Sequence, residues 1–213
     1  MIDNISLIAQ SAVRIKDILG RIIYFDPFKL EDEYVKDADY IFISHPHFDH
    51  FSPDDILKIK KERTKIIAPI ELNDKIKKLG FNEHDVMLVE PNNEYEIENI
   101  IFQTIPAYNI NKDFHKREFN WVGYIVVIDG KRIYFAGDTD CTDEARRVKC
   151  DVAFVPIGGT YTMTCDEAVG LIKEIKPGLA IPMHYATIVG SVDDALNFKE
   201  LLKDDAHVEI LMM

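Results

Sequence analysis

Apolar residues in the first half of the chain come in short runs that charged or turn-forming residues interrupt. Runs rich in Ile, Val, Phe and Tyr predict strands at residues 5–10, 21–28, 40–44, 65–69 and 86–91. Two intervening segments, residues 52–63 and 70–80, have the apolar spacing of amphipathic helices. Ser52 is the expected N-cap of the first helix, and Pro53 suits its first helical position.

The pattern changes in the second half. Residues 94–108 and 121–137 predict consecutive antiparallel strands, with a hairpin turn at Asp129 and Gly130. Strands and helices then alternate, with strands expected at 151–159, 179–185 and 207–213 and helices at 165–176 and 192–203. Strands followed by such an alternation predict two sheets packed together, with helices on the outer faces.

Length and composition favour one folded domain. A chain of 213 residues fits one large domain, and it shows no linker or internal repeat, so we expect a single domain at 1–213. Asp3, Arg14, Lys16 and Asp17 interrupt the apolar segment at the start, which predicts no signal peptide. We therefore expect a cytoplasmic protein with no membrane partner.

The net charge argues against a nucleic-acid-binding protein, and the cysteine pattern argues against a protein built on disulfides or on cysteine-bound zinc. A net charge of -12 argues against binding to a nucleic-acid backbone, because such binding depends on Lys and Arg. Cys141, Cys150 and Cys165 are odd in number and lack CxxC spacing, which argues against a disulfide framework or a cysteine zinc site.

The candidate chemistry is concentrated directly after the strand at residues 40–44. His45, His47, Asp49 and His50 occupy six positions between that strand and the helix beginning near Ser52. Imidazole nitrogens and a carboxylate are typical ligands of zinc-like ions, and His45 and His47 face the same way in an extended backbone. Asp49 and His50 can then turn toward a second ion. A polar loop with incidental histidines is the alternative.

This HxHxDH motif after a hydrophobic strand resembles the metallo-β-lactamase superfamily. Asp26, Asp138 and His184 follow the superfamily's order, each near the end of an expected strand. The resemblance implies an α+β fold, a four-layer αββα sandwich of two mixed β-sheets with helices on the outer faces. It also implies that Asp26 supports the metal loop, that Asp138 bridges two ions, and that His184 is a ligand.

Four further motifs, "IPAYN", "GDTD", "PIGGTYTM" and "IPMHY", narrow the resemblance. They look like the branch of metal-dependent hydrolases similar to ascorbate-6-phosphate lactonase. The resemblance implies hydrolysis of an ester-type bond, a lactone first and a phosphodiester second, by a metal-activated hydroxide. The implied cofactors are two divalent ions, with zinc preferred and manganese an alternative. Asp49 is the residue expected to orient the attacking water or collect its proton.

The chain departs from the superfamily at one ligand. The position of the third histidine of the first metal site holds Asn109, and an amide oxygen is a weaker zinc ligand than imidazole. His115 lies six residues further on, in a polar loop long enough to fold back. The sequence leaves open whether Asn109 or His115 completes the site, and whether the site holds a single ion.

Several residues beside these motifs are candidates for substrate binding. Gly158 and Gly159 precede a helix start, where backbone N–H groups can hold an anion, although a tight structural turn is an equal alternative. The hydroxyls of Tyr108, Tyr161 and Tyr185 could contact substrate, with packing at a pocket wall as the alternative. The expected partner is a small anionic molecule, because two dications would leave the pocket positive. A homo-oligomer is left open.

Two other functions remain as alternatives. One is a superfamily nuclease, against which the acidic composition and the lack of a basic arm both argue. The other is a non-catalytic metal-binding sensor, in which the change to Asn109 has removed turnover.

Overall fold

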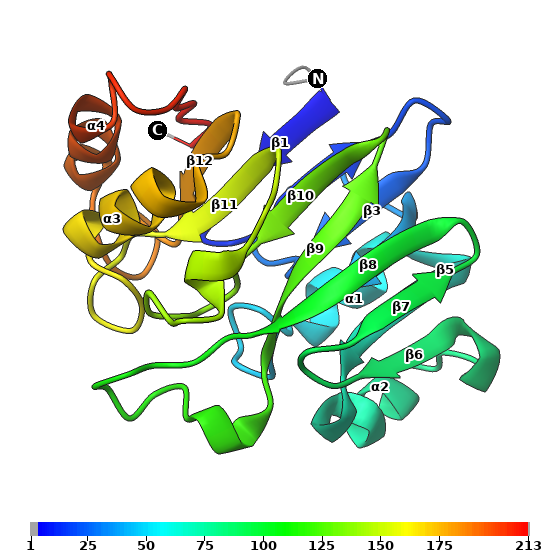
Figure 1. The fold of residues 1–213 in the computed structure, drawn as a ribbon. Coiled ribbons are helices and arrows are strands. Elements are labelled where there is room, and N and C mark those ends of the chain that lie inside the picture. Colours follow the sequence, from blue (N-terminus) through cyan, green and yellow to red (C-terminus); the bar gives the residue numbers. More distant parts are fainter. Residues whose placement is uncertain (1–3, 213) are drawn as a thin grey trace. The chain divides into compact units, whose positions relative to one another are not determined.

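The computed structural model describes residues 4–212, and the chain divides into two compact units (Figure 1). Unit 1 is Met1–Glu90 and unit 2 is Pro91–Met213. Each unit contains its own six-stranded sheet. The single domain expected from the sequence stays a prediction, and the two units are described in turn.

The sheet of unit 1 follows the chain order. Its strands are β1 (Ile5–Leu7), β2 (Val13–Lys16), β3 (Ile22–Phe25), β4 (Ala38–Phe42), β5 (Lys60–Pro69) and β6 (Val86–Val89). The first three strands pair antiparallel and the last four pair parallel, so the sheet is mixed. The parallel pairs need crossovers, which contain the helical segments α1 (Pro53–Ile59), η2 (Ile70–Leu72), α2 (Asn73–Lys78) and η3 (Glu83–Asp85).

The start of α1 was predicted correctly and its end was not. Ser52 caps the helix through its side chain and Pro53 is in the first turn. The helix ends at Ile59, however, because β5 begins at Lys60 and pairs with β4. The hydroxyl of Thr64 donates to the carbonyl of Ala38 at 2.7 Å and helps hold this edge. Pairing between strands therefore overrides the helical propensity of the charged segment. Strand β2 was also missed.

The helices of unit 1 cover one face of its sheet through a single apolar cluster. Ile56 and Ile59 of α1 and Ile76 of α2 are buried together with alternate residues of the strands. Those strand residues include Ile22, Tyr24, Ile41, Ile66 and Ala68. The period of two along the strands places these side chains on the same face, toward the helices. This packing fixes the edge at which β3 and β4 end, where the metal-loop residues begin.

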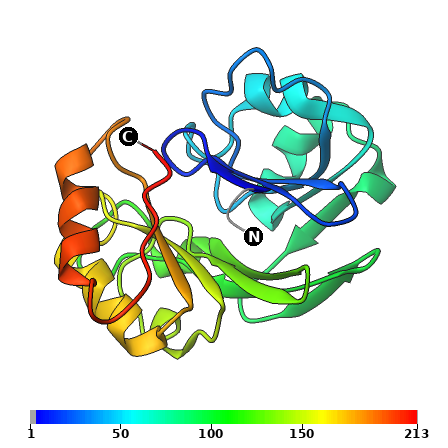
Figure 2. The same cartoon turned by 90° about the horizontal axis from the view of Figure 1, so that it is seen from above.

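Unit 2 contains the second mixed sheet. Its strands are β7 (Glu94–Ile97), β8 (Ile100–Pro106), β9 (Val122–Ile128), β10 (Lys131–Phe135), β11 (Val152–Pro156) and β12 (Leu179–Met183). Strands β7 to β10 pair antiparallel, and β10 to β12 pair parallel. The helical segments are η4 (Arg117–Phe119), η5 (Ala145–Arg147), α3 (Cys165–Ile175) and α4 (Val192–Leu201). Figure 2 shows α3 and α4 side by side, and Cys165 and Asn197 are in contact between them.

Local signals in unit 2 agree with the expected elements. Asp129 and Gly130 both have positive φ, 52° and 72°, as the hairpin between β9 and β10 requires. Thr164 and Glu167 form a reciprocal capping box at the start of α3. Lys176 ends that helix in the left-handed conformation, directly before Pro177, which cannot continue it. The antiparallel strands, the hairpin and this helix are confirmed.

The strand expected at residues 207–213 is wrong. In its described part, residues 207–212, the segment pairs with β12 through an isolated bridge between Ala180 and Val208. Further along, the carbonyl of Met212 accepts a hydrogen bond from the hydroxyl of Tyr185, a side-chain contact in place of ladder pairing. Met213 lies outside the described residues. Within residues 4–212, no helix is both long and apolar enough to cross a membrane.

Candidate metal centre

The histidine loop of unit 1 directly follows β4. The backbone N–H of Ile43 still donates to Ile67 in β5, after which the chain leaves the sheet. Backbone N–H groups of His50 and Phe51 both donate to the carbonyl of His47, so the loop turns tightly before Ser52 caps α1. His45, Asp49 and His50 are buried, while His47 is half-buried. A short loop anchored at both ends thus presents all four predicted ligands.

Asp26 organises this loop from the end of β3. Its carboxylate accepts hydrogen bonds from the backbone N–H of Ser44 at 2.7 Å and from the Ser44 hydroxyl at 2.5 Å. Its Oδ2 also lies 2.6 Å from Nδ1 of His50. Burial raises the pKa of Asp26, and the contacts with His50 and Ser44 oppose that shift. An ionised Asp26 only accepts, so in that state His50 donates through Nδ1 and presents the lone pair of Nε2 as a ligand atom.

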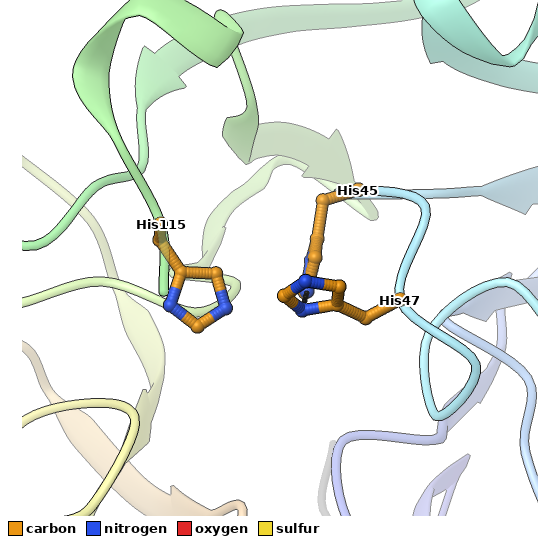
Figure 3. A group of neighbouring side chains, drawn as sticks. All are labelled: His45, His47 and His115. Carbon is orange, nitrogen blue, oxygen red and sulfur yellow. Dashed lines mark hydrogen bonds between the residues drawn. The ribbon is translucent and has the colours of Figure 1, made fainter. Parts of the chain in front are cut away.

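His45 and His47 lie close together in the same loop. Nε2 of His45 is 3.0 Å from Nδ1 of His47, and the ring centroids are 4.6 Å apart at nearly perpendicular orientation. Figure 3 shows the two rings at the loop after β4, and it also draws His115 of unit 2, whose loop leads into η4. His45, His50 and Asp26 each offer a ligand atom within 4.8 Å of the others. The predicted ligands His45, His47 and His50 therefore lie together, beside the predicted supporting residue Asp26.

One contributor from unit 1 was missed. Gln10 is buried in the turn between β1 and β2, with φ at 52°, and its side-chain amide donates to Oδ2 of Asp49 at 3.1 Å. Nε2 of His50 lies 3.5 Å from the same oxygen. A glutamine next to apolar residues carries no local signal of such a contact, because its partner is 39 positions away.

Unit 2 brings together the remaining predicted ligands. Asp138 follows β10, and its Oδ2 lies 3.3 Å from Nε2 of His115 and 3.1 Å from Nε2 of His184. All three side chains are buried. His184 follows β12 with φ at 59°, a left-handed conformation that is uncommon for residues other than glycine. Two imidazole nitrogens thus converge on one carboxylate oxygen.

Asn109 and His115, the two alternatives for the missing ligand, are in direct contact. Oδ1 of Asn109 lies 3.0 Å from Nδ1 of His115 and accepts from the backbone N–H of His115 at 3.1 Å. The amide nitrogen of Asn109 donates to Asp140 at 3.1 Å and to the carbonyl of Tyr161 at 2.9 Å. The amide oxygen is therefore directed at His115. Asp140 was missed, although it belongs to the same "GDTD" motif as Asp138.

The candidate substrate residues have diverse contacts. Tyr185 is buried, and its hydroxyl donates a hydrogen bond to the carbonyl of Met212. Burial raises the pKa of Tyr185 to about 12. The hydroxyl of Tyr108 donates to Glu144 at 2.9 Å, and the ring of Tyr161 packs edge-on against Phe114.

The two glycines form a tight turn. A Cβ on Gly158 would lie 2.4 Å from the carbonyl oxygen of His184, so the glycine permits close packing there. The N–H of Gly159, whose φ is 77°, donates to the carbonyl of Met163. These contacts favour the structural role of the glycines, and substrate contact by any of the five residues stays a prediction.

The donor set in each unit fits a divalent transition metal. Imidazole and carboxylate are the ligands that zinc takes in hydrolytic sites. His50 and His115 each direct their Nδ1 at an oxygen, of Asp26 and Asn109 respectively. Metal-binding histidines commonly donate through the second ring nitrogen in this way, which fixes the ring and its tautomer. Unit 1 and unit 2 each contain this arrangement.

The chain has known relatives along most of its length. A family described as the beta-lactamase superfamily domain matches residues 4–184. The chain belongs to this superfamily. A UPF0173 metal-dependent hydrolase of Pyrococcus abyssi is 34% identical over 205 residues, which cover 89% of the chain and 88% of the relative. The chain therefore also belongs to the UPF0173 family and is a metal-dependent hydrolase.

Solved structures show the same fold. A protein of Parabacteroides distasonis described as a metal-dependent hydrolase has 29% sequence identity and a TM-score of 0.83, covering 98% of this chain and 93% of its own. Igni18, a metallo hydrolase of Ignicoccus hospitalis, has 26% identity and a TM-score of 0.80 over 97% of this chain and 93% of its own. The predicted α+β class with two mixed β-sheets, the metallo-β-lactamase fold, is confirmed.

Proposed function

We propose that this hydrolase cleaves ester-type bonds, a lactone first and a phosphodiester second, with two divalent ions. One observation carries the proposal: Oδ2 of buried Asp138 faces Nε2 of both His115 and His184, at 3.3 and 3.1 Å. Three lone-pair donors in such proximity suit a bound cation. Zinc fits the imidazoles best, and manganese is the alternative.

The proposed ligands are those that the sequence predicts, with His115 completing the set. They are His45, His47, Asp49, His50, His115, Asp138 and His184. We assign His115 in place of Asn109, because the amide oxygen of Asn109 is directed at the His115 ring. Imidazole is also the stronger zinc ligand of the two. Asp26 and Asn109 hold ligands and are not themselves ligands in this proposal.

The protein side chains have separate tasks. When bound, divalent ions supply Lewis acidity, which polarises the ester oxygen and lowers the pKa of water. Asp138 would hold bound metal through the carboxylate oxygen that lies beside Nε2 of His115 and His184. Asp49 is the proposed proton acceptor, and the hydrogen bond from Gln10 orients its carboxylate. Asp26 fixes the ring of His50, and Gly158 allows His184 to pack closely.

The choice of substrate rests on sequence resemblance and charge. The four motifs similar to the ascorbate-6-phosphate lactonase branch favour a lactone, and an anionic small molecule suits a pocket with two dications. The net charge of -12 does not favour a nucleic acid. Tyr108, Tyr161, Gly158 and Gly159 remain the proposed substrate contacts. Tyr185 is the weakest candidate because it is fully buried, whereas Tyr108 is half-buried. We place the reaction in the cytoplasm.

Metal analysis combined with a substrate panel tests the proposal. The protein is purified without an affinity tag, its metal content is measured by mass spectrometry, and lactones, phosphodiesters and short RNA are assayed. We expect about two ions per chain and turnover of a lactone that Asp49→Ala abolishes. Turnover of RNA without turnover of any lactone or small phosphodiester would support the nuclease. Ligand binding without turnover, in both the parent protein and Asp49→Ala, would support a non-catalytic metal-binding sensor. Neither outcome is compatible with the proposed function.

A further inference from the structure

A buried carboxylate in unit 2 connects a lysine to the candidate ligand loop. Asp140 lies in the segment after β10, and its Oδ1 accepts from Nζ of Lys112 at 2.6 Å and from the amide nitrogen of Asn109 at 3.1 Å. Its Oδ2 accepts from the backbone N–H of Ile110 at 2.9 Å. The ammonium group compensates the buried charge, and charge-assisted hydrogen bonds of this kind are about twice as strong as neutral ones.

The contacts of Asn109 determine which way its amide points. Its nitrogen faces two atoms that only accept, the Asp140 carboxylate and the carbonyl of Tyr161. Its oxygen accepts a hydrogen bond from the backbone N–H of His115. A flipped amide would place oxygen against the carboxylate and nitrogen against an N–H donor, leaving buried groups unsatisfied. Asp140 therefore holds the amide oxygen of Asn109 toward His115.

The orientation of the amide determines the tautomer of His115. The oxygen that lies 3.0 Å from Nδ1 can only accept, so a neutral His115 carries its proton on Nδ1. The lone pair is then on Nε2, the nitrogen that lies 3.3 Å from Oδ2 of Asp138. The backbone also helps, because the N–H of Asn109 donates to the carbonyl of His115 at 2.7 Å and closes the loop between them.

We propose that Lys112, Asp140 and Asn109 are positioning residues that fix the Nδ1–H tautomer of His115 and direct its Nε2 toward Asp138. Asn109 acts on the ring directly, whereas Asp140 and Lys112 act through Asn109. The asparagine at the expected position of a histidine ligand is then the partner of the ligand that replaces it. The consequence for metal affinity rests on the proposed function, but the tautomer does not.

Unit 1 offers a matched control with the same chemistry. Asn82 donates through its side chain to buried Asp85 at 3.1 Å, and Lys65 lies 2.6 Å from the same carboxylate. Burial alone would raise the pKa of Asp85, but the hydrogen bonds from Lys65 and Asn82 lower it overall. The side chain of Asp85 contacts Lys65, Asn82 and His84, none of which is a predicted ligand. Asn82→Ala therefore removes a similar hydrogen bond without a predicted effect on the metal.

The test compares Asn109→Ala, Lys112→Met and Asn82→Ala in the full chain. The tautomer of His115 is read from long-range proton–nitrogen NMR spectra of metal-free, histidine-labelled protein, with His115→Gln assigning the signal. Zinc affinity is measured by competition with a chelating dye. We expect the Nδ1–H form in the parent protein and a substantial Nε2–H population in Asn109→Ala. We also expect zinc affinity to fall roughly 10- to 100-fold, the usual effect of losing such a partner.

The controls separate positioning from general damage. Lys112→Met should shift the NMR signal of His115 in the same direction but to a smaller extent, whereas Lys112→Arg should keep the signal of the parent protein. Asn82→Ala should leave the tautomer of His115 and the zinc affinity unchanged. An unchanged tautomer in a folded Asn109→Ala would overturn the inference, as would an equal loss of zinc affinity in Asn82→Ala. If Asn109→Ala fails to fold, Lys112→Met and Lys112→Arg take its place. An unchanged tautomer in Lys112→Met, or an equal loss of zinc affinity in Asn82→Ala, would then overturn the inference. A parent protein that binds no divalent ion refutes the proposed function, while the tautomer still decides the inference.

Discussion

Gln10 and Asp49, which are 39 positions apart, share a buried hydrogen bond of 3.1 Å between Nε2 and Oδ2. The backbone of Gln10 is held in the left-handed region with φ at 52°. Residues other than glycine adopt this conformation at a cost of roughly 1–2 kcal/mol, so surrounding interactions must offset it. The turn between β1 and β2 offsets part of it, since Ile8 donates to Ala12 across the turn. Asp26 and His184 have positive φ as well.

Gln10→Leu should weaken metal binding while the protein stays folded. The substitution keeps the size of the side chain but removes the donor that orients Asp49. We expect zinc affinity, measured by chelator competition, to fall roughly tenfold, at the lower end of the usual range for such partners. Gln103→Leu is the matched control, because half-buried Gln103 also donates to a carboxylate, that of Glu94, but through an exposed hydrogen bond. Equal effects of the two substitutions would contradict a specific role for Gln10.

Asp26→Asn should destabilise the protein through its lost acceptor, not through the backbone. The carboxylate accepts hydrogen bonds from Ser44 and His50. In the variant, the amide nitrogen faces one of these donors and leaves that donor without an acceptor, which costs about 1–3 kcal/mol of folding stability. Asparagine tolerates positive φ, so the conformation itself is not the cause. Urea unfolding measures the loss. Asp129→Asn is the control: at φ 52° in the exposed hairpin turn it should change stability by less than about 0.5 kcal/mol. A similar loss in both variants would refute this explanation.

Gly158→Ala should displace His184. Its Cβ would lie 2.4 Å from the His184 carbonyl oxygen and 3.2 Å from Nδ1 of the same residue, and backbone at that distance must shift. We expect a loss of about 1–3 kcal/mol, typical of overpacking, together with weaker zinc binding. Gly170→Ala in α3 is the control, because a Cβ there meets no atom within 4 Å and should stabilise the helix by roughly 0.5–1 kcal/mol. Normal zinc affinity in Gly158→Ala would show that His184 does not depend on this packing.

The sequence predicted what depends on neighbouring residues. The loop from His45 to His50, the cap at Ser52 and the turn at Asp129 and Gly130 all have short-range signals, and the structure contains each of them. The boundary between α1 and β5 could not be predicted in this way, because pairing with β4 decides it. Strand β2 and the single bridge at Val208 likewise depend on distant partners.

In the candidate site, too, residue types could be predicted from the sequence but contacts between distant segments could not. His115 and Asn109 were both visible as polar residues near an expected strand end, but their contact depends on how the loop between them closes. Gln10 and Asp140 were invisible as contributors, because each acts through one hydrogen-bonded partner in a segment far along the chain. A motif lists residue types in order, whereas orienting partners depend on which loops meet.

Removal of the metal should lower thermal stability, and Asp138→Asn should abolish the difference. A ligand that binds only the folded state stabilises it by an amount that depends on its concentration, about 2.7 kcal/mol at 100 times the dissociation constant. Adding a chelator should therefore lower the melting temperature of the parent protein, and adding zinc should restore it. Asp138→Asn replaces an oxygen that two imidazoles face with a group that carries no charge, so zinc should no longer raise its melting temperature. Asp129→Asn again serves as the control and should respond to zinc as the parent does. A full zinc response in Asp138→Asn would mean that this carboxylate is not a ligand, and that the other proposed ligands bind zinc without it.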